Sequence, residues 1–188
     1  MRELILKREI VVNKILCRLL GVGIFLILSC LGAFVRIPLP FTPVPITLQT
    51  FFVLLSGAFL GSKLGFLTQL SYIFLGIWGL PIFTGAGSGL LYLLGPTGGY
   101  LLGFVLAAFL IGSFIKFSDN LLFTFALFCL GDAVLLFCGT LWLKFLFGYD
   151  LTRALFIGFL PFIPGDLLKI TAASVIYGRL RSRLKEIF

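Results

Sequence analysis

Two ionisable side chains, Asp166 and Lys169, lie one helical turn apart in a long apolar stretch, IPGDLLKITAASVIYG. If that stretch crosses a membrane, each charge costs about 2.5–3.5 kcal/mol to place in hydrocarbon. Residues at i and i+3 share a helix face, so the pair could simply neutralise itself between helices. It could also bind a polar solute, because lysine donates to a carboxylate and aspartate accepts N–H bonds from an amide or urea. We favour the binding interpretation.

Other polar side chains interrupt apolar stretches. Asp132 lies within LFCLGDAVLLF, where it could cap a kink, bond a hydroxyl group on another helix, or contact a ligand. Gln49 and Thr50 begin another apolar stretch and could be either interfacial polar groups or ligand contacts. We therefore add Asp132 and Gln49 to the candidate ligand-binding residues.

The composition is that of an integral membrane protein. Of the 188 residues, 60% are hydrophobic and only 12% are charged, whereas about a quarter of the residues in a soluble domain are charged. The alternating segments typical of spanning β-strands are absent from the sequence, so the backbone must be hydrogen-bonded within helices. We predict one all-α transmembrane substrate-binding domain over 1–188, with six transmembrane helices at about 15–35, 46–61, 64–79, 98–115, 121–147 and 164–177.

Lysine and arginine are distributed unequally between the two sides of these spans. Eleven lie before the first span, after the last, or in the turns after the second and fourth, against three on the opposite side, Arg36, Lys144 and Arg153. The positive-inside rule then predicts that both termini are cytoplasmic, in the bacterial inner (cytoplasmic) membrane. Because the net charge of +8 comes from these flanks, the lipid bilayer is the expected partner of the basic residues, and no nucleic acid is expected.

Several kinds of active site are excluded by what the sequence lacks. It has no histidine, which removes most general-base, zinc and serine-triad designs, and it has no GxxxxGK[ST] phosphate loop. The GxGxG string at 85–89 follows no strand and predicts a flexible outer loop. The four cysteines lack metal-ligand spacing and are expected to be buried free thiols. We therefore predict a protein that is not an enzyme and has no cofactor or metal site.

The loops on the predicted outer side are unusual. The first, RIPLPFTPVPIT, carries four alternating prolines, which fix φ and remove backbone donors, so a stiff extended segment is expected. The second, GLPIFTGAGSGLLYLLGPTGGY, is rich in glycine, which permits tight turns and close approach to a bound molecule. The third, at 148–164, is ambiguous: it is either a plain loop or a loop that contains a short apolar helix closed by Pro161 and Pro164. In the second case Asp166 falls in the first turn of the last helix.

Three stretches together resemble the BioY family, the biotin-specific S components of energy-coupling factor (ECF) transporters: RIPLPFTPVPITLQTFFVLLSGAFLG, LGIWGLPIFTGAGSGLLYLLGPTGGYLLGF and PFIPGDLLK. The similarity runs over 36–169 in the family's order and spacing. The resemblance implies a six-helix substrate-binding membrane subunit whose site opens to the outside. It also implies that the first loop, with Pro43 and Pro45, covers biotin as a lid, and that the second loop, with Phe83 and Gly87, lines the pocket.

The resemblance also assigns site residues. The family's GDxxK signature contains Asp166 and Lys169, which become polar ligands for biotin, and the GPTGGY segment gives Gly98, Gly99 and Tyr100 a lining role. The side-chain chemistry suggests Lys169 for the valerate carboxylate and Asp166 for the ureido N–H groups, with the reverse arrangement open. The implied partners are biotin, as the transported ligand, a membrane coupling subunit and two ATP-hydrolysing subunits.

One departure concerns docking. S components usually carry an AxxxA-type pattern on the first helix, whereas Ser29 and Ala33 here make one small-xxx-small step, either a contact within the chain or a docking surface. Three other functions remain open. They are an S component for another small vitamin, an intramembrane enzyme that uses Asp132 and Asp166 as paired carboxylates, and a purely structural assembly subunit.

Overall fold

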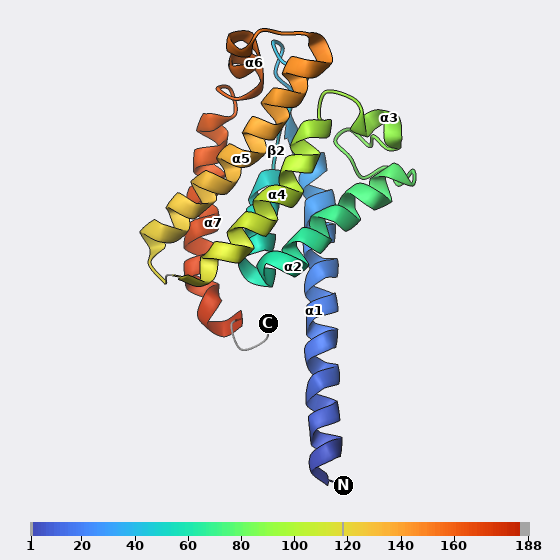
Figure 1. Ribbon diagram of the computed structural model, residues 1–188, viewed down its shortest axis with the longest axis vertical. Helices are drawn as coiled ribbons and strands as arrows, with labels where there is room; N and C mark the ends of the chain where they lie inside the picture. Colours follow the sequence, from blue (N-terminus) through green and yellow to red (C-terminus); the bar gives the residue numbers. More distant parts are fainter. Residues whose placement is uncertain (1, 118, 185–188) are drawn as a thin grey trace.

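The computed structural model describes residues 2–117 and 119–184, with side chains over 14–117 and 119–181. Over these residues the chain is helical apart from one short hairpin, as expected for an all-helical membrane protein. Figure 1 shows a bundle from whose lower end α1 projects, with the hairpin, α3 and α6 gathered at the upper end. The elements in order are α1 (Arg2–Phe34), β1 (Arg36–Ile37), β2 (Ile46–Thr47), α2 (Gln49–Ile77), α3 (Leu90–Leu93), α4 (Gly98–Phe114), η1 (Ile115–Phe117), α5 (Leu121–Phe147), α6 (Leu151–Gly158) and α7 (Ile163–Leu184).

The number of membrane spans depends on how two bent helices are counted. Over the described residues, four helical stretches are long and apolar enough to cross a membrane: Lys14–Phe34, Gln49–Ile77, Gly98–Phe117 and Leu121–Phe147. The pair α6 and α7, bent by 52° at its break, makes a fifth if it is counted as one span. The predicted spans 46–61 and 64–79 correspond to the two halves of α2 and overrun its ends by two or three residues, so counting these halves separately gives the six predicted segments.

The reversal inside α2 takes a single residue, Gly61. Its φ of 78° and ψ of 178° lie in a region open essentially to glycine alone, and the helix resumes directly after it. A Cβ added to Gly65 would lie 3.0 Å from the Cα of Gly57, so the two halves fold back on each other. The turn expected between the predicted spans 46–61 and 64–79 is therefore made by one residue, because a single glycine suffices to turn the chain.

Helix α4 packs directly on this bend. A Cβ on Gly57 would meet the carbonyl oxygen of Ala108 at 2.5 Å, and one on Gly112 would meet the carbonyl carbon of Gly61 at 2.3 Å. Only glycine allows the two backbones to approach so closely. One apolar cluster, which includes Leu54, Ile111, Phe128 and Ile170, fills this end of the bundle. A second cluster, which includes Val53, Phe104, Leu135 and Phe162, lies towards the hairpin and borders a pocket.

The first predicted loop folds back as a hairpin rather than running straight. Strands β1 and β2 pair antiparallel, with Arg36 opposite Thr47 and Ile37 opposite Ile46. The backbone N–H of Leu48 then donates to the carbonyl oxygens of two residues near the end of α1, Gly32 and Val35, at 3.2 and 3.1 Å. The prolines exclude helix from this loop, and the pairing of its two ends brings its return arm over the start of α2.

The segment between α5 and α7 contains a short helix, which is one of the two arrangements that the sequence left open. Helix α5 ends at Gly148, whose φ of 66° is left-handed, and the Asp150 side chain caps α6 by accepting from the backbone N–H of Arg153. Helix α7 begins at Ile163, so Pro164 lies at its second position, where its missing N–H costs nothing. Asp166 consequently falls in the first turn of α7, as predicted.

The small residues of α1 form a contact within the chain. Ser29 and Ala33 are both fully buried, and the Ser29 hydroxyl accepts a hydrogen bond of 3.4 Å from the amide of Gln69 on α2. The side chains of Leu19, Ile24 and others on the opposite face of α1 are more than half exposed. An apolar exposed face of this kind suits lipid, so the small-residue step is explained by helix packing within the chain.

Candidate functional site

A pocket lies between the hairpin and the adjacent ends of α2, α4, α5 and α7. Its empty space is about 480 Å³, a volume that includes space open to solvent. Its walls are mostly apolar, and its polar groups gather around the start of α2 and α7. The lining residues are Val44, Pro45, Thr47, Gln49, Thr50, Thr84, Tyr92, Thr97, Tyr100, Leu101, Phe104, Leu135, Leu136, Phe162, Asp166 and Lys169.

The Lys169 ammonium group is the cation of this pocket. It forms an ion pair with Oδ1 of Asp166, and it donates to Oγ1 of Thr50 at 2.6 Å and to the carbonyl oxygen of Thr47 at 2.9 Å. These three acceptors match the three N–H donors of an ammonium group. The side chains of Lys169 and Asp166 are 12% and 3% exposed, so the pair is held at low dielectric.

Thr50 connects the two charges. Its hydroxyl accepts from Lys169 and donates to Oδ1 of Asp166 at 3.2 Å. The other carboxylate oxygen of Asp166, Oδ2, is buried and has no hydrogen-bond partner among the described residues. The i, i+3 spacing on α7 therefore produces the predicted ion pair, and the first turn of α2 holds it in place.

A second set of hydrogen bonds fixes the Gln49 amide. Its Nε2 donates to the hydroxyl of Tyr72 at 2.7 Å, and that hydroxyl donates to the carbonyl oxygen of Ile82 at 3.0 Å. The hydroxyl of Thr84 donates to Oε1 of Gln49 at 3.3 Å. These bonds tie the start of α2 to the second outer loop, so the amide faces the pocket in a defined orientation.

Tyr100 and aromatic and aliphatic side chains make the opposite wall. The Tyr100 hydroxyl donates to the carbonyl oxygen of Gly158 at 2.6 Å, which ties α4 to the end of α6. Its ring lies 5.8 Å from the ring of Phe162, and both line the pocket with Phe104 and Leu136. The pocket therefore offers one charged polar corner, one neutral polar corner and an apolar body.

Five of the residues predicted from the sequence line this pocket: Asp166, Lys169, Gln49, Tyr100 and Pro45. Gly98 and Gly99 do not line it. A Cβ on Gly98 would meet the carbonyl oxygen of Leu93 at 1.7 Å, and one on Gly99 would meet Cβ of Trp142 at 2.2 Å, so these glycines allow close packing at the start of α4. Pro43 is exposed at the tip of the hairpin loop.

Phe83 and Gly87 build the second outer loop rather than the pocket wall. The fully buried Phe83 ring packs 5.5 Å from the ring of Tyr72 and 4.9 Å from the ring of Tyr92. Its backbone N–H donates to the carbonyl oxygen of Gly87 at 3.0 Å, and a Cβ on Gly87 would lie 2.3 Å from the Tyr92 ring. These two residues position Tyr92, which does line the pocket.

Asp132 lines a neighbouring cavity between α5, the α6–α7 turn and α7, with an empty space of about 380 Å³ that is partly open to the outside of the protein. Asp166 lines both this cavity and the ligand pocket. Asp132 is 5% exposed, and its Oδ1 has no hydrogen-bond partner among the described residues. The two carboxylates, which lie on separate helices, therefore face one shared cavity, although the sequence alone gave no sign that they meet.

Several lining residues were not among the predicted site residues. Thr47 and Thr50 flank Gln49 in the sequence, so their nearness to a predicted polar site residue was a usable signal. The apolar wall carried no such signal, because 23 phenylalanines are distributed throughout the chain.

The four cysteines are free thiols, and each is partly exposed rather than buried as expected. Within the described residues, no group of three or more acidic or cysteine side chains could hold a metal ion.

Comparison with known proteins gives consistent matches over most of the chain. A family model described as the BioY family matches residues 7–186. The biotin transporter BioY of Thermotoga maritima is 41% identical over 87% of this chain and 95% of that protein. The biotin transporter BioY of Lactococcus lactis subsp. cremoris is 36% identical over 81% of this chain and 84% of that protein. The crystal structure of the S-component for biotin from an ECF-type ABC transporter aligns with a TM-score of 0.85 and 33% identity, over 90% of this chain and 93% of that one. This chain therefore belongs to the BioY family.

Proposed function

We propose that this chain binds biotin from outside the cell and is the substrate-binding S component of an ECF-type ABC transporter. The observation that carries the proposal is the buried Asp166–Lys169 pair at the edge of a pocket with a neutral polar corner and an apolar body. Ionisable groups at such a depth are costly, and a ligand that offers both a carboxylate and N–H groups repays that cost. Relatives that cover most of the chain carry the name biotin transporter.

In the proposed pose, the valerate carboxylate of biotin meets the ammonium group of Lys169. It replaces one of the three acceptors of this ammonium group. The ureido group is at the opposite end of biotin, too far from the ion pair to bind Asp166, and it reaches the neutral polar corner, where the hydrogen-bonded Gln49 amide faces it. The fused rings and the aliphatic chain lie against Phe104 and Phe162. The return arm of the hairpin, through Pro45, covers the ligand.

We place both termini on the cytoplasmic side, with the hairpin, α3 and α6 outside. In Figure 1 the start of α1 and the end of α7 both lie towards the end of the molecule opposite these three elements. The basic residues are concentrated in the flanks and in the turns at that end, as the positive-inside rule requires. The protein is then a multi-pass protein of the cytoplasmic membrane.

The sequence contains no phosphate-binding loop for ATP, so energy must come from other subunits. We propose a membrane coupling subunit and two ATP-hydrolysing subunits, as the ECF context of the related crystal structure suggests. Because Ser29 and Ala33 are buried within the chain, the coupling subunit must contact other residues than these two.

The direct test is equilibrium binding of biotin to the purified protein, with a competition panel. The panel contains biotin methyl ester, which lacks the negative charge, desthiobiotin, which keeps the ureido group, and unrelated small vitamins. We expect biotin to bind most tightly and the ester at least about tenfold more weakly, the loss of about 1.4 kcal/mol in a charge-assisted contact. Another vitamin that competes better than biotin would assign the pocket to that ligand, and millimolar affinity for every compound would refute a transport role.

A further inference from the structure

The cavity beside the ligand pocket has a charge imbalance. Its lining is apolar apart from two carboxylates and one thiol: Cys129, Asp132, Ala133, Leu136, Phe159, Ile163, Asp166, Leu167 and Ile170. Asp132 and Asp166 are 5% and 2% exposed, and each has a buried oxygen without a hydrogen-bond partner among the described residues. A buried oxygen of this kind is destabilising unless a donor reaches it.

Lys169 is the one cation on the lining of either cavity, and it already pairs with Asp166. If both carboxyl groups were ionised, two negative charges would face one positive charge at low dielectric. An uncompensated buried charge costs several kcal/mol. One of the two carboxyl groups must therefore be neutral, or a cation must lie between them.

A metal cation does not suit this lining. Ca²⁺ and Mg²⁺ take six or more oxygen ligands, whereas the cavity offers two carboxyl groups among apolar side chains. A proton needs no more than one donor oxygen and one acceptor, and the cavity of about 380 Å³ leaves room for a bridging water. We propose that Asp132 and Asp166 hold one proton between them, and that the binding of an anionic ligand in the adjacent pocket requires this proton.

The second part of the proposal rests on the proposed function. When the ligand carboxylate accepts a hydrogen bond from Lys169, the ammonium group balances the negative charge of Asp166 less completely. The hydroxyl of the protonated Asp132 then donates towards Oδ2 of Asp166 through the bridging water. The Asp166 carboxylate therefore keeps a hydrogen-bond donor. No covalent bond changes, and the proton stays on the pair throughout.

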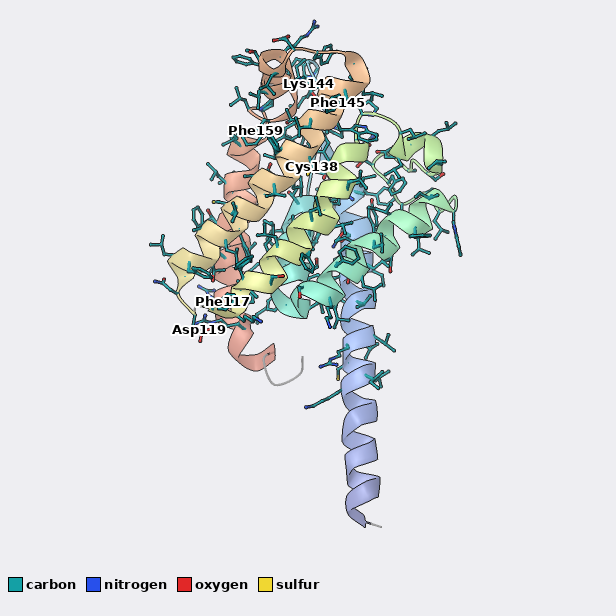
Figure 2. The ribbon with its side chains drawn as sticks, viewed as in Figure 1. Phe117, Asp119, Cys138, Lys144, Phe145 and Phe159 are labelled. Carbon is teal, nitrogen blue, oxygen red and sulfur yellow. The ribbon has the colours of Figure 1, made fainter. Side chains whose placement is uncertain are left out.

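The other titratable groups near the pair are few. Cys129 shares the cavity from α5, Lys169 reaches Asp166 from its own helix, and Tyr100 lies across the pocket on α4. Helix α2 contributes the hydroxyl of Thr50, and the α6–α7 turn contributes the ring of Phe159, seen between α5 and α7 in Figure 2. Loss of a proton from Lys169 would also weaken the binding of an anionic ligand at alkaline pH, so the tests must separate it from loss of the proton shared by the two carboxyl groups.

The first test needs no ligand. Infrared spectra of the purified protein should contain the C=O stretch of a protonated carboxyl group at neutral pH, and this band should be lost at alkaline pH and in Asp132→Asn. Asp150→Asn, which changes an exposed acidic residue, should keep the band. Absence of the band in the wild type would overturn the shared proton, whether or not biotin binds.

The second test measures biotin affinity from neutral to alkaline pH. In the wild type and in Asp150→Asn, affinity should weaken about tenfold per pH unit once the proton is lost. Asp132→Asn cannot lose a proton, so its affinity should stay level over that range. The same slope in all three proteins would point to Lys169 and overturn the coupling, as would a level wild-type profile. If the infrared band is present but biotin does not bind, the shared proton is supported and the proposed function is refuted.

Discussion

The hydroxyl group of Thr50 should contribute measurably to ligand affinity, although it carries no charge. It accepts from Lys169 at 2.6 Å and donates to Asp166 at 3.2 Å, so it holds both charges in place. Thr50→Val keeps the shape of the side chain and removes both bonds. A hydrogen bond to a charged group contributes about 1.5–3 kcal/mol, which corresponds to about a tenfold to hundredfold weakening of biotin binding.

Isothermal titration of the purified variant measures this directly. The matched control is Thr171→Val, because Thr171 lies on the exposed side of α7 and its hydroxyl donates to the backbone carbonyl of Leu167 at 2.7 Å. We expect the control to bind as the wild type does. If Thr50→Val binds as tightly as Thr171→Val, the threonine bridge has no part in ligand recognition and the reasoning from these distances is wrong.

Two further predictions concern the scaffold. Gly61→Ala places a side chain at φ 78°, ψ 178°, which should lower the free energy of unfolding by about 1–3 kcal/mol in an SDS titration. Gly23→Ala in α1, where an added Cβ meets nothing within 4 Å, should not destabilise; equal losses in both variants would contradict the role of the bend. Tyr72→Phe leaves the amide of Gln49 and the carbonyl oxygen of Ile82 without their shared partner, and should cost about 1–3 kcal/mol in the same titration. A Tyr72→Phe protein as stable as the wild type would show that water replaces the hydroxyl.

Much of the helical architecture was predictable because its signals are local. Helix α5 has the predicted bounds of 121–147, and α4 begins at Gly98 as predicted, since apolar runs and flanking breakers mark both. The proline at the start of α7 and the charge pair one turn apart were equally visible. The family predicted from the loops is confirmed by the family model and by relatives that cover most of the chain.

The parts that could not be predicted depend on contacts between distant segments. Nothing in the sequence near Gly61 distinguishes a one-residue reversal from a short connector. The resemblance gave Gly98 and Gly99 a pocket-lining role, but in the structure the missing side chain of Gly99 allows Trp142 of α5 to pack against the start of α4. The shared cavity of Asp132 and Asp166 arises because the α6–α7 turn leaves space between two helices, which only the packing of these helices determines.

In the proposed complex, the ammonium group of Lys169 receives the charged end of the ligand. Biotin affinity of Lys169→Ala, compared with the wild type and with Lys144→Ala, tests this most directly. Figure 2 places Lys144 near the upper end of the bundle, and it does not line the pocket, so its loss should leave binding intact. Removing Lys169 should weaken binding by about 2 kcal/mol or more, about thirtyfold, because Asp166 and the ligand carboxylate lose the cation between them. Equal affinity in the two alanine variants would contradict the account.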